Sequence, residues 1–424
     1  MFYKETDFKE EPFIGEIPKD WDVAKLGDKS ISEIIMGQSP PSSTYNKDGV
    51  GLPFLQGKME FGDIYPKVLV YCSKPIKIAE PNDVLFSVRA PVGDVNLAPY
   101  KLCIGRGLAA IRFNNERVSH SFYFYWFQKI KKHLEALGKG STFKAVNKDD
   151  LENLRVPLPP LNEQRGIVGV LGVVDSVIAK TGEVIAKAER LKKGLMQTLL
   201  TRGIGHKEYK QTPIGTTPKT WKVVRVEDVT SQIIDSPHKI PIKEKSGIPF
   251  VSVNYMLRFP DYNFFIDETI DEIEYISEED SQEFLKRFNP EKEDILYSKW
   301  GTPGIAKLIN TERKFIGSCS VALIKTRKDI IDSLYLVYAL NSQTVQHQII
   351  PYSKTSTRTE IHIGHIKRIK IPLPPLEEQK EIVKVLSTVD RKLAFERNEK
   401  TRLECIKRGL MDLLLTGKIR VKVD

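Results

Sequence analysis

The chain has few cysteines and no long hydrophobic stretch. Its four cysteines are scattered and form no C-x-x-C pair, which excludes a disulfide framework and a zinc cage and predicts reduced, buried thiols. The longest nearly apolar run, Ile167 to Val174, is much shorter than the roughly 20 residues of a membrane-spanning helix. Residues 1–11 are rich in charge and lack the apolar core of a secretory signal, so we expect a cytoplasmic protein.

Acidic residues are outnumbered by basic ones. The 424 residues include 65 Lys and Arg against 55 Asp and Glu, a formal net charge of +10. Excess positive charge favours a polyanionic partner, because each phosphate that is neutralised releases counterions. A composition rich in Lys and Glu is also typical of heat-adapted proteins, so the charge alone leaves both readings open. At about 150 residues per domain, the length predicts two or three domains.

One plan occurs twice along the chain. The segment 17–21, which ends in Trp21, returns as 217–221 with Trp221. The pattern D-[VI]-L-[FY]-S stands at 83–87 and again at 294–298. The pattern P-L-P-P-L-x-E-Q occurs within 156–164 and 371–379, and a similar helical segment follows each copy. Each half is therefore a variable globular region followed by a constant segment.

The globular regions combine short strands with helices. Runs rich in β-branched and aromatic residues predict strands at 68–71, 84–88, 108–113, 295–297 and 321–324, and aromatic runs predict buried helices at 122–127 and 334–340. We therefore predict an α/β (α+β) fold with two pseudo-symmetric globular domains. The predicted boundaries are a first domain at 1–160, a long helix at 161–203, a second domain at 204–375, a second long helix at 376–417 and a C-terminal tail at 418–424.

The two long helices carry apolar residues at alternating steps of four and three. This spacing is typical of a coiled-coil seam. Because a long helix with one exposed apolar stripe is unstable alone in water, we expect the two helices to pair, antiparallel, about a pseudo-two-fold axis. The residues predicted to pair are Val170, Val174, Val177, Leu191 and Leu195 in the first helix and Ile382, Leu386, Val389, Leu393, Leu403 and Leu410 in the second.

Two similar domains on a paired-helix core suit a long, regular polyanion, and DNA repeats at about 34 Å per turn. Because the loops of the two domains differ, the two DNA segments that they recognise are expected to differ as well. An asymmetric target with an unread spacer is therefore favoured over a palindrome.

The chain resembles the specificity (S) subunit of type I restriction-modification systems over almost its whole length. The resemblance is carried by I-P-x-x-W at 17–21, by the two D-[VI]-L-[FY]-S segments, by Gly-Ser-Thr at 140–142 and by the repeated P-L-P-P-L-x-E-Q. It implies a non-catalytic DNA-recognition subunit with two target recognition domains. Each domain would read half of an asymmetric bipartite site, and the helices would fix the spacer.

The resemblance also implies partners. These are double-stranded DNA, two methyltransferase (M) subunits that dock on the helices, and restriction/translocase (R) subunits. S-adenosylmethionine, ATP and Mg are expected only in those subunits, and no catalytic residue, cofactor, metal or membrane partner is expected for this chain. In agreement, the sequence lacks an Asn/Asp-Pro-Pro-Tyr/Phe methyltransferase loop and a G-x-x-x-x-G-K-[ST] phosphate loop, and His362 and His365 lack a third metal ligand.

Candidate DNA-binding residues lie in polar loops near strand ends. Arg pairs with guanine, Lys meets phosphate and hydroxyl groups serve either role, although each of these residues could equally belong to an ordinary solvated surface. The candidates are Gln38, Ser42, Ser43, Arg89, Arg106, Lys139, Ser141, Thr142 and Lys144 in the first domain and His238, Lys239, Lys299, Trp300, Lys354, Ser356, Thr357 and Arg358 in the second.

Two other hypotheses remain open at this point. A coiled-coil scaffold with two protein-binding heads would bind DNA weakly and independently of salt. An enzyme that acts on nucleic acid would turn over its substrate as the purified chain, which the missing motifs argue against.

Overall fold

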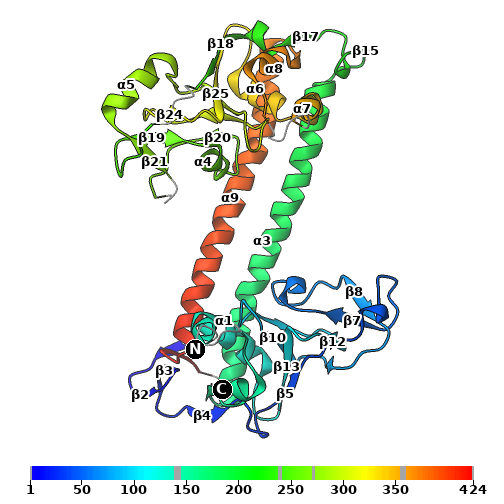
Figure 1. The fold of residues 1–424 in the computed structure, drawn as a ribbon, viewed down its shortest axis with the longest axis vertical. Helices are drawn as coiled ribbons and strands as arrows, with labels where there is room; N and C mark the ends of the chain where they lie inside the picture. Colours follow the sequence, from blue (N-terminus) through cyan, green and yellow to red (C-terminus); the bar gives the residue numbers. More distant parts are fainter. Residues whose placement is uncertain (1, 138–144, 237–240, 270–272, 354–359, 423–424) are drawn as a thin grey trace. The chain divides into compact units, whose positions relative to one another are not determined.

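The computed structural model describes residues 2–137, 145–236, 241–269, 273–353 and 360–422. The chain divides into unit 1, Met1–Gly182 with Glu399–Asp424, and unit 2, Glu183–Asn398. Unit 1 is thus built from two separate stretches, whereas unit 2 is continuous. Each unit contains a globular part, here called its head, and portions of two long helices, α3 (Leu161–Arg202) and α9 (Leu376–Leu414) (Figure 1).

Two sheets form the head of unit 1. An antiparallel sheet has the order β11–β10–β13–β5, and a second sheet, β6–β8–β7–β12–β9, contains the parallel pair β7 and β12. Helix α1 (His120–Leu137) packs on the first sheet, where the rings of Phe113 and Tyr123 stack with centroids 4.6 Å apart. The strands are β5 (Ser32–Met36), β6 (Tyr45–Asn46), β7 (Leu52–Leu55), β8 (Val70–Cys72), β9 (Ile78–Ala79), β10 (Val84–Ser87), β11 (Val95–Leu97), β12 (Leu102–Ile104) and β13 (Leu108–Phe113).

The head of unit 2 repeats this plan with changes. Its main sheet has the order β18–β25–β22–β23–β20, and a smaller sheet, β21–β19–β24, again contains a parallel pair, β19 and β24. Two helices, α6 (Ser333–Leu340) and α7 (Gln343–Ser353), stand where unit 1 has α1. The other elements are β18 (Thr230–Asp235), β19 (Ile248–Val251), α4 (Val253–Leu257), β20 (Asn263–Phe264), β21 (Glu274–Ile276), α5 (Glu278–Arg287), β22 (Ile295–Ser298), β23 (Ala306–Ile309), β24 (Ile316–Gly317) and β25 (Val321–Thr326).

Short antiparallel pairs surround the base of each head. The hairpin β2–β3 and the pair β4–β14 of unit 1 match β15–β16 and β17–β26 of unit 2, and in unit 1 β1 pairs with β27, so the two ends of the chain meet. These elements are β1 (Phe2–Lys4), β2 (Phe8–Glu11), β3 (Gly15–Pro18), β4 (Asp22–Lys25), α2 (Lys148–Glu152), β14 (Arg155–Leu158), β15 (Tyr209–Thr212), β16 (Gly215–Pro218), β17 (Lys222–Arg225), α8 (Ile363–Arg368), β26 (Lys370–Leu373) and β27 (Ile419–Val421), with 3-10 turns at Ser42–Thr44, Lys58–Glu60 and Val226–Val229.

The long helices begin and end where the sequence predicts within a few residues. Each starts directly after a double proline, since proline supplies no N–H to a ladder and is tolerated at a helix start. Gly203 and Gly417 follow them with φ of 64° and 67°, the left-handed backbone conformation that glycine adopts without strain at a helix end. The second helix ends at Leu414 rather than at 417, and 419–421 form β27 rather than a free tail.

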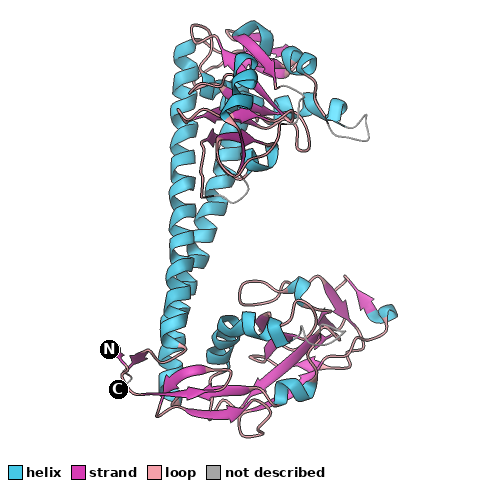
Figure 2. Cartoon of the chain, turned by 60° about the vertical axis from the view of Figure 1, so that its left-hand side comes forward, coloured by secondary structure: helices cyan, strands magenta, loops and turns pink. Residues whose placement is uncertain are grey.

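Helices α3 and α9 pack against each other, antiparallel, as the seam predicted (Figures 1 and 2). In unit 1 the first part of α3 shares a core with the last part of α9, through Ile167, Leu171, Met411 and Leu414. In unit 2 the last part of α3 shares a core with the first part of α9, through Met196, Leu200, Ile382 and Leu386. Both stripes therefore contribute to the cores of the units.

The inner face of α3 differs in part from the predicted seam. Val177 and Leu191 are 42% and 56% exposed, so these two predictions are wrong. The less exposed positions here are Ile178, Ile185 and Lys192, each one residue beyond the heptad positions 177, 184 and 191. An α-helix of 3.6 residues per turn drifts away from a strict seven-residue repeat in this way. Of the other predicted residues, Ile382, Leu386 and Leu393 are buried, and Val170, Val174, Leu195, Val389, Leu403 and Leu410 are half-buried.

Two of the four cysteines are buried as predicted, and two are not. Cys72 and Cys103 are buried as predicted, whereas Cys405 is exposed on α9 because it lies on the side of the helix away from the core, and Cys319 is half-buried. None of the helices within the described residues is long and apolar enough to cross a membrane.

Candidate nucleic-acid interface

Each head is joined to a long helix by the same hydrogen bonds. Trp21 Nε1 donates to Glu163 Oε2 at 3.1 Å, and Trp221 Nε1 donates to Glu378 Oε2 at 2.9 Å. The residue after each glutamate is a fully buried glutamine whose side chain donates to a proline carbonyl of the same P-L-P-P-L segment, as found for Gln164 and Gln379. The repeated pattern is therefore a structural joint, which orients the helix relative to the head.

The joints differ in the side chain that contacts the glutamate from beyond the end of a long helix. In unit 1 the guanidinium of Arg420 makes two bonds to Glu163, at 2.6 and 2.8 Å, and also reaches Glu5 and Asp20. In unit 2 the Nε2 atom of His206 lies 2.8 Å from Glu378 Oε1. Arg420 and His206 each follow the glycine that ends a long helix, so they occupy equivalent places in the repeat.

Three loops of unit 1 meet at one edge of its head. Glycines make this possible: a Cβ on Gly105 would stand 3.1 Å from the Gln56 backbone and from Ser39 Oγ. Ser39 Oγ accepts hydrogen bonds from the Arg106 backbone N–H at 3.1 Å and from the Gln56 side chain at 3.2 Å. The structure thus holds Gln56 and Arg106 together on a rigid edge.

Predicted residues of the first domain gather at this edge. Gln38 is exposed and its N–H donates to the carbonyl of Ile104, two residues before Arg106. Arg89 is exposed and follows Val88, whose N–H donates to the Gly107 carbonyl. Ser42 and Ser43 lie exposed in the 3-10 turn after Gln38. The edge of unit 1 is defined here as Gln38, Gln56, Arg89 and Arg106.

Sequence reasoning missed Gln56, although the repeat held a signal for it. Gln56 comes two residues after Pro53-Phe54, and Ser252 has the same place after Pro249-Phe250. An exposed polar position that differs between two copies of one frame is a candidate for recognition, since the frame alone does not require it.

The equivalent edge of unit 2 has other side chains on the same backbone frame. The N–H of Ser318 donates to the Val251 carbonyl at 2.8 Å, as the N–H of Gly105 donates to Leu55 at 2.8 Å. This match aligns Cys319 with Arg106 and Ser320 with Gly107. Ser318 and Ser320 hydroxyls lie 2.5 Å apart, and Ser320 Oγ accepts from the Val253 N–H. The side chains of residues 318–320 at the edge of unit 2 are therefore short and carry hydroxyl and thiol groups where unit 1 has an arginine.

The structure corrects the prediction for Lys299. Its side chain is only 3% exposed and forms an ion pair with Asp235, so its ammonium is not presented to a phosphate outside the head. An opposite charge offsets the cost of burying a charged amine, and Asp235 at the end of β18 supplies it. The neighbouring Trp300 is 37% exposed and stands where unit 1 has Arg89, since each forms an isolated bridge with the strand-like residue before the next helix.

Ten predicted residues lie outside the described residues. They are Lys139, Ser141, Thr142, Lys144, His238, Lys239, Lys354, Ser356, Thr357 and Arg358.

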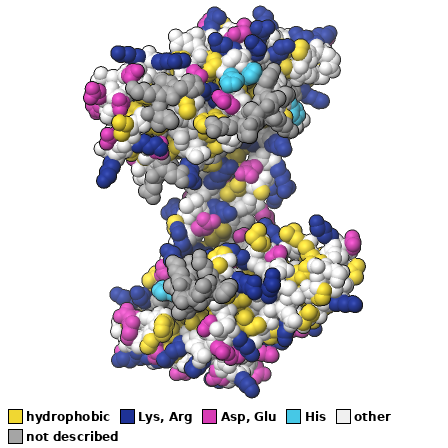
Figure 3. All heavy atoms as spheres, viewed as in Figure 1, with side chains coloured by type: hydrophobic (Ala, Val, Ile, Leu, Met, Phe, Trp, Pro, Cys, Tyr) yellow, Lys and Arg dark blue, Asp and Glu magenta, His cyan; other side chains and the backbone are white. Residues whose placement is uncertain are grey.

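Basic groups are spread over the visible surface of each unit and alternate with acidic groups (Figure 3). Within the described residues, no group of three or more His, Cys, Asp or Glu side chains is placed to hold a metal ion.

A duplicated α/β head on antiparallel helices, with one frame and two different loop edges, defines a recognition protein with two non-identical binding surfaces. The family model described as "Type I restriction modification DNA specificity domain" matches residues 18–190 and 218–405, one match for each half. The chain belongs to this family of type I restriction-modification specificity subunits, whose role is DNA recognition.

Relatives match the chain in part or throughout. A putative type I restriction enzyme specificity subunit of Methanocaldococcus jannaschii is 54% identical over 188 residues, which are 44% of this chain and 44% of the relative. The MjaVIII specificity subunit of the same organism is 27% identical over 429 residues, 100% of this chain and 98% of the relative.

Two solved structures share the fold. The type I restriction-modification S subunit from M. genitalium gives a TM-score of 0.58 at 17% identity, covering 96% of this chain and 97% of that one. A chain from a study of complex assembly and conformational transition in a type I system gives 0.55 at 20% identity, covering 95% of this chain and 99% of that one.

Proposed function

We propose that this chain is the non-catalytic reader of a type I restriction-modification complex, with each head recognising one half of an asymmetric bipartite DNA site. The observation that carries the proposal is the contrast between shared joints and unlike edges. The Trp-Glu-Gln joints recur atom for atom, while Gly-Arg-Gly at 105–107 is replaced by Ser-Cys-Ser at 318–320. Two heads that present different groups on one frame suit two different base sequences.

The edge of unit 1 favours a half-site that contains purines. Arg106 and Arg89 suit guanine, which offers two acceptors in the major groove, and Gln38 and Gln56 suit adenine, which offers a donor and an acceptor. In unit 2, Ser252 and Ser320 have less reach, and Trp300 offers apolar contact with a thymine methyl group.

The paired helices are proposed to fix the spacer between the half-sites. Inserting four residues after Gly182 and four after Arg397 lengthens both helices by about 6 Å. We expect the preferred spacer to change by one or two base pairs, or binding to fail because the heads are also rotated. An unchanged spacer would exclude this role for the helices.

Catalysis and assembly are assigned to partner subunits. The proposed partners are double-stranded DNA, two methyltransferase subunits and restriction/translocase subunits in the cytoplasm. S-adenosylmethionine, ATP and Mg would bind to those subunits and not to this chain.

A methylome of the source cell tests the whole proposal. We expect one bipartite, adenine-methylated motif that disappears when this chain is deleted and returns when it is restored. Arg106→Cys gives this edge the side chain that unit 2 has at Cys319 and should change only the half-site read by unit 1. Gly105 and Gly107 are kept, because a Cβ there would stand 3.1 and 2.7 Å from the Gln56 backbone. If deletion leaves the methylome unchanged, and the purified chain binds DNA weakly and without dependence on salt, the alternative of a scaffold with two protein-binding heads holds instead.

A further inference from the structure

Each unit contains a buried Tyr-Asp-Lys triad at the contact between head and helices. In unit 1 the Tyr125 hydroxyl donates to Asp175 Oδ2 at 2.7 Å, and Lys407 Nζ lies 2.7 Å from Asp175 Oδ1. Tyr125 belongs to α1 of the head, Asp175 to α3 and Lys407 to α9. One carboxylate thus joins three elements.

Unit 2 repeats the triad with the long helices exchanged. The Tyr338 hydroxyl donates to Asp390 Oδ2 at 2.7 Å, and Lys192 Nζ lies 2.5 Å from Asp390 Oδ1. Here the aspartate comes from α9 and the lysine from α3. In both units, tyrosine and aspartate belong to one copy of the repeat and lysine to the other, so each triad ties the two copies together.

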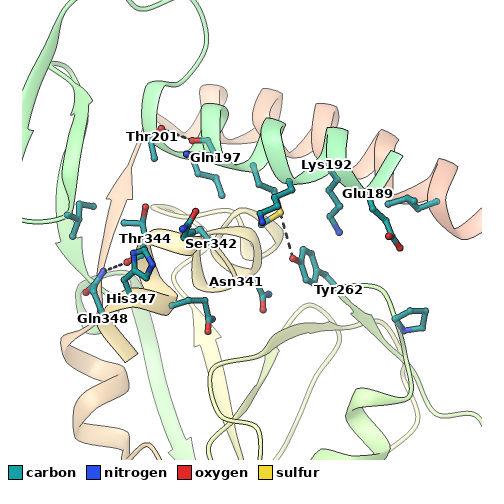
Figure 4. Close-up of a pocket in the computed structure, with 18 of the residues that line it drawn as sticks. Glu189, Lys192, Gln197, Thr201, Tyr262, Asn341, Ser342, Thr344, His347 and Gln348 are labelled. Carbon is teal, nitrogen blue, oxygen red and sulfur yellow. Dashed lines mark hydrogen bonds between the residues drawn. The ribbon is translucent and has the colours of Figure 1, made fainter. Parts of the chain in front are cut away.

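The polar groups of each triad are largely withdrawn from water, so they satisfy one another's hydrogen bonds and charges. The aspartate and lysine side chains are mostly buried in both units. Burial, together with the hydrogen bond to aspartate, raises the pKa of the Tyr125 phenol, and burial together with the charge of Asp390 raises that of Tyr338, so both remain donors. Lys192 also lies 3.9 Å from the centroid of the Tyr262 ring, and Figure 4 shows the two side chains pointing toward one another at a cavity of about 1030 Å³.

Each triad attaches the head to the helices at a distance from the joint. The joint glutamate and the triad aspartate are Glu163 and Asp175 in α3, and Glu378 and Asp390 in α9. Both pairs are the same number of residues apart, about 18 Å along a helix axis. A head held at the joint alone could pivot about it, whereas a second attachment about 18 Å away fixes its direction.

We propose that Tyr125, Asp175 and Lys407, and their counterparts Tyr338, Asp390 and Lys192, are positioning residues that fix the direction of each head on the helix pair and so determine how strictly the complex selects one spacer length. This inference rests on the proposed function. The triads are not proposed to contact DNA. They act by fixing the orientation of each head, and with it the orientation of its edge.

The test uses the full chain assembled with its methyltransferase subunits and DNA duplexes carrying its own two half-sites at a series of spacer lengths. The variant is Tyr125→Phe with Tyr338→Phe, which removes two hydroxyls and no ring. We expect affinity for the best spacer to stay within about threefold, and its advantage over spacers one base pair shorter or longer to fall by about fivefold or more. The base preference within each half-site should not change.

A matched control separates positioning from general stability. Tyr262→Phe removes a hydroxyl that donates to Met196 Sδ at 3.7 Å and belongs to neither triad, while keeping the ring beside Lys192. It should leave spacer selectivity as in the wild type. If the double Phe variant aggregates, Lys192→Met with Lys407→Met provides a second way to release the heads, and the same loss of selectivity is expected.

The inference is overturned if folded triad variants keep wild-type spacer selectivity, or if their affinity falls equally at every spacer length. Failure of the proposed function looks different, because the wild-type complex itself would then show no preference for any bipartite site.

Discussion

Unit 1 and unit 2 are alike where a head meets the helices and unlike where their loops end. The Trp–Glu hydrogen bonds of the joints and the Tyr-Asp-Lys triads recur in both units, as Trp21–Glu163 matches Trp221–Glu378. At the edges, Arg106 of unit 1 corresponds to Cys319 of unit 2, because each follows a residue with an equivalent backbone hydrogen bond. The comparison teaches that the fold keeps its frame and its recognition surface on separate residues, so that one can change without the other.

The sharpest difference within the frame lies at the side chain that contacts the joint glutamate, Arg420 in unit 1 and His206 in unit 2. Arg420→Ala leaves the buried carboxylate of Glu163 without its guanidinium, and we expect unit 1 to lose about 3–5 kcal/mol of unfolding free energy. His206→Ala should cost unit 2 only about 1–2 kcal/mol, because Glu378 keeps the N–H groups of Trp221 and Ile204. Hydrogen exchange of each head measures both losses.

The exposed Lys418→Ala is the control for the Arg420 experiment, since it removes a charge close by without touching the joint. Equal losses in the two units would contradict the view that their joints are stabilised differently.

The edges provide the next comparison. Arg106→Ala should weaken binding by about 1–3 kcal/mol, which is roughly 5- to 150-fold, and only on DNA that carries the half-site of unit 1. Cys319→Ala should change affinity by less than about threefold, because a thiol is a weak donor. Competition with duplexes in which one half-site is scrambled measures both. A loss that is uniform over all sequences would mean that Arg106 contacts phosphate and reads no base.

A buried lysine in unit 2 replaces an amide in unit 1. Lys307 bonds the carbonyl groups of Phe259 and Asp261, as the Asn96 side chain bonds Gly62. Burial lowers the pKa of Lys307 to about 8 from its ordinary value of 10.5. Between these values the unfolded chain binds more protons than the folded one, so stability rises with pH across this window.

We therefore expect unit 2 to gain about 1–3 kcal/mol between pH 7.5 and 9.5, with no such gain in unit 1. Protection factors for β22 and β23, corrected for intrinsic exchange, measure it. In Lys307→Asn the rise should vanish; if it persists, another group is responsible.

The smallest effect concerns the inner face of α3. Val177→Ala should change the unfolding free energy by less than about 0.5 kcal/mol, because the side chain is exposed. Its neighbour Ile178 is half-buried, and Ile178→Ala should cost about 1–2 kcal/mol. Denaturant unfolding of the two variants measures both losses. A larger loss for Val177→Ala than for Ile178→Ala would support the predicted heptad instead.

The sequence predicted those features that are local or repeated. Double prolines and helix-ending glycines located α3 and α9, and short β-rich runs located β10, β13, β22 and β25. It did not predict interactions that join distant residues. Nothing near Lys299 shows that Asp235 neutralises it, and nothing in the last residues shows that Arg420 closes a joint with Glu163. Gln56 lies at the edge because β7 pairs with β12, and no local sequence pattern predicts that pairing.

The order in which the two units can be completed during synthesis follows from the division of unit 1 into two stretches. Unit 2 is one continuous stretch, Glu183–Asn398, whereas unit 1 needs residues from 399 onward, including Arg420. During translation all residues of unit 2 are therefore present before those of unit 1, because unit 1 also needs residues from 399 onward. This reverses the usual order in which N-terminal domains fold earlier. A truncation just before Glu399 would keep every residue of unit 2 and remove Met411 and Leu414 from the core of unit 1.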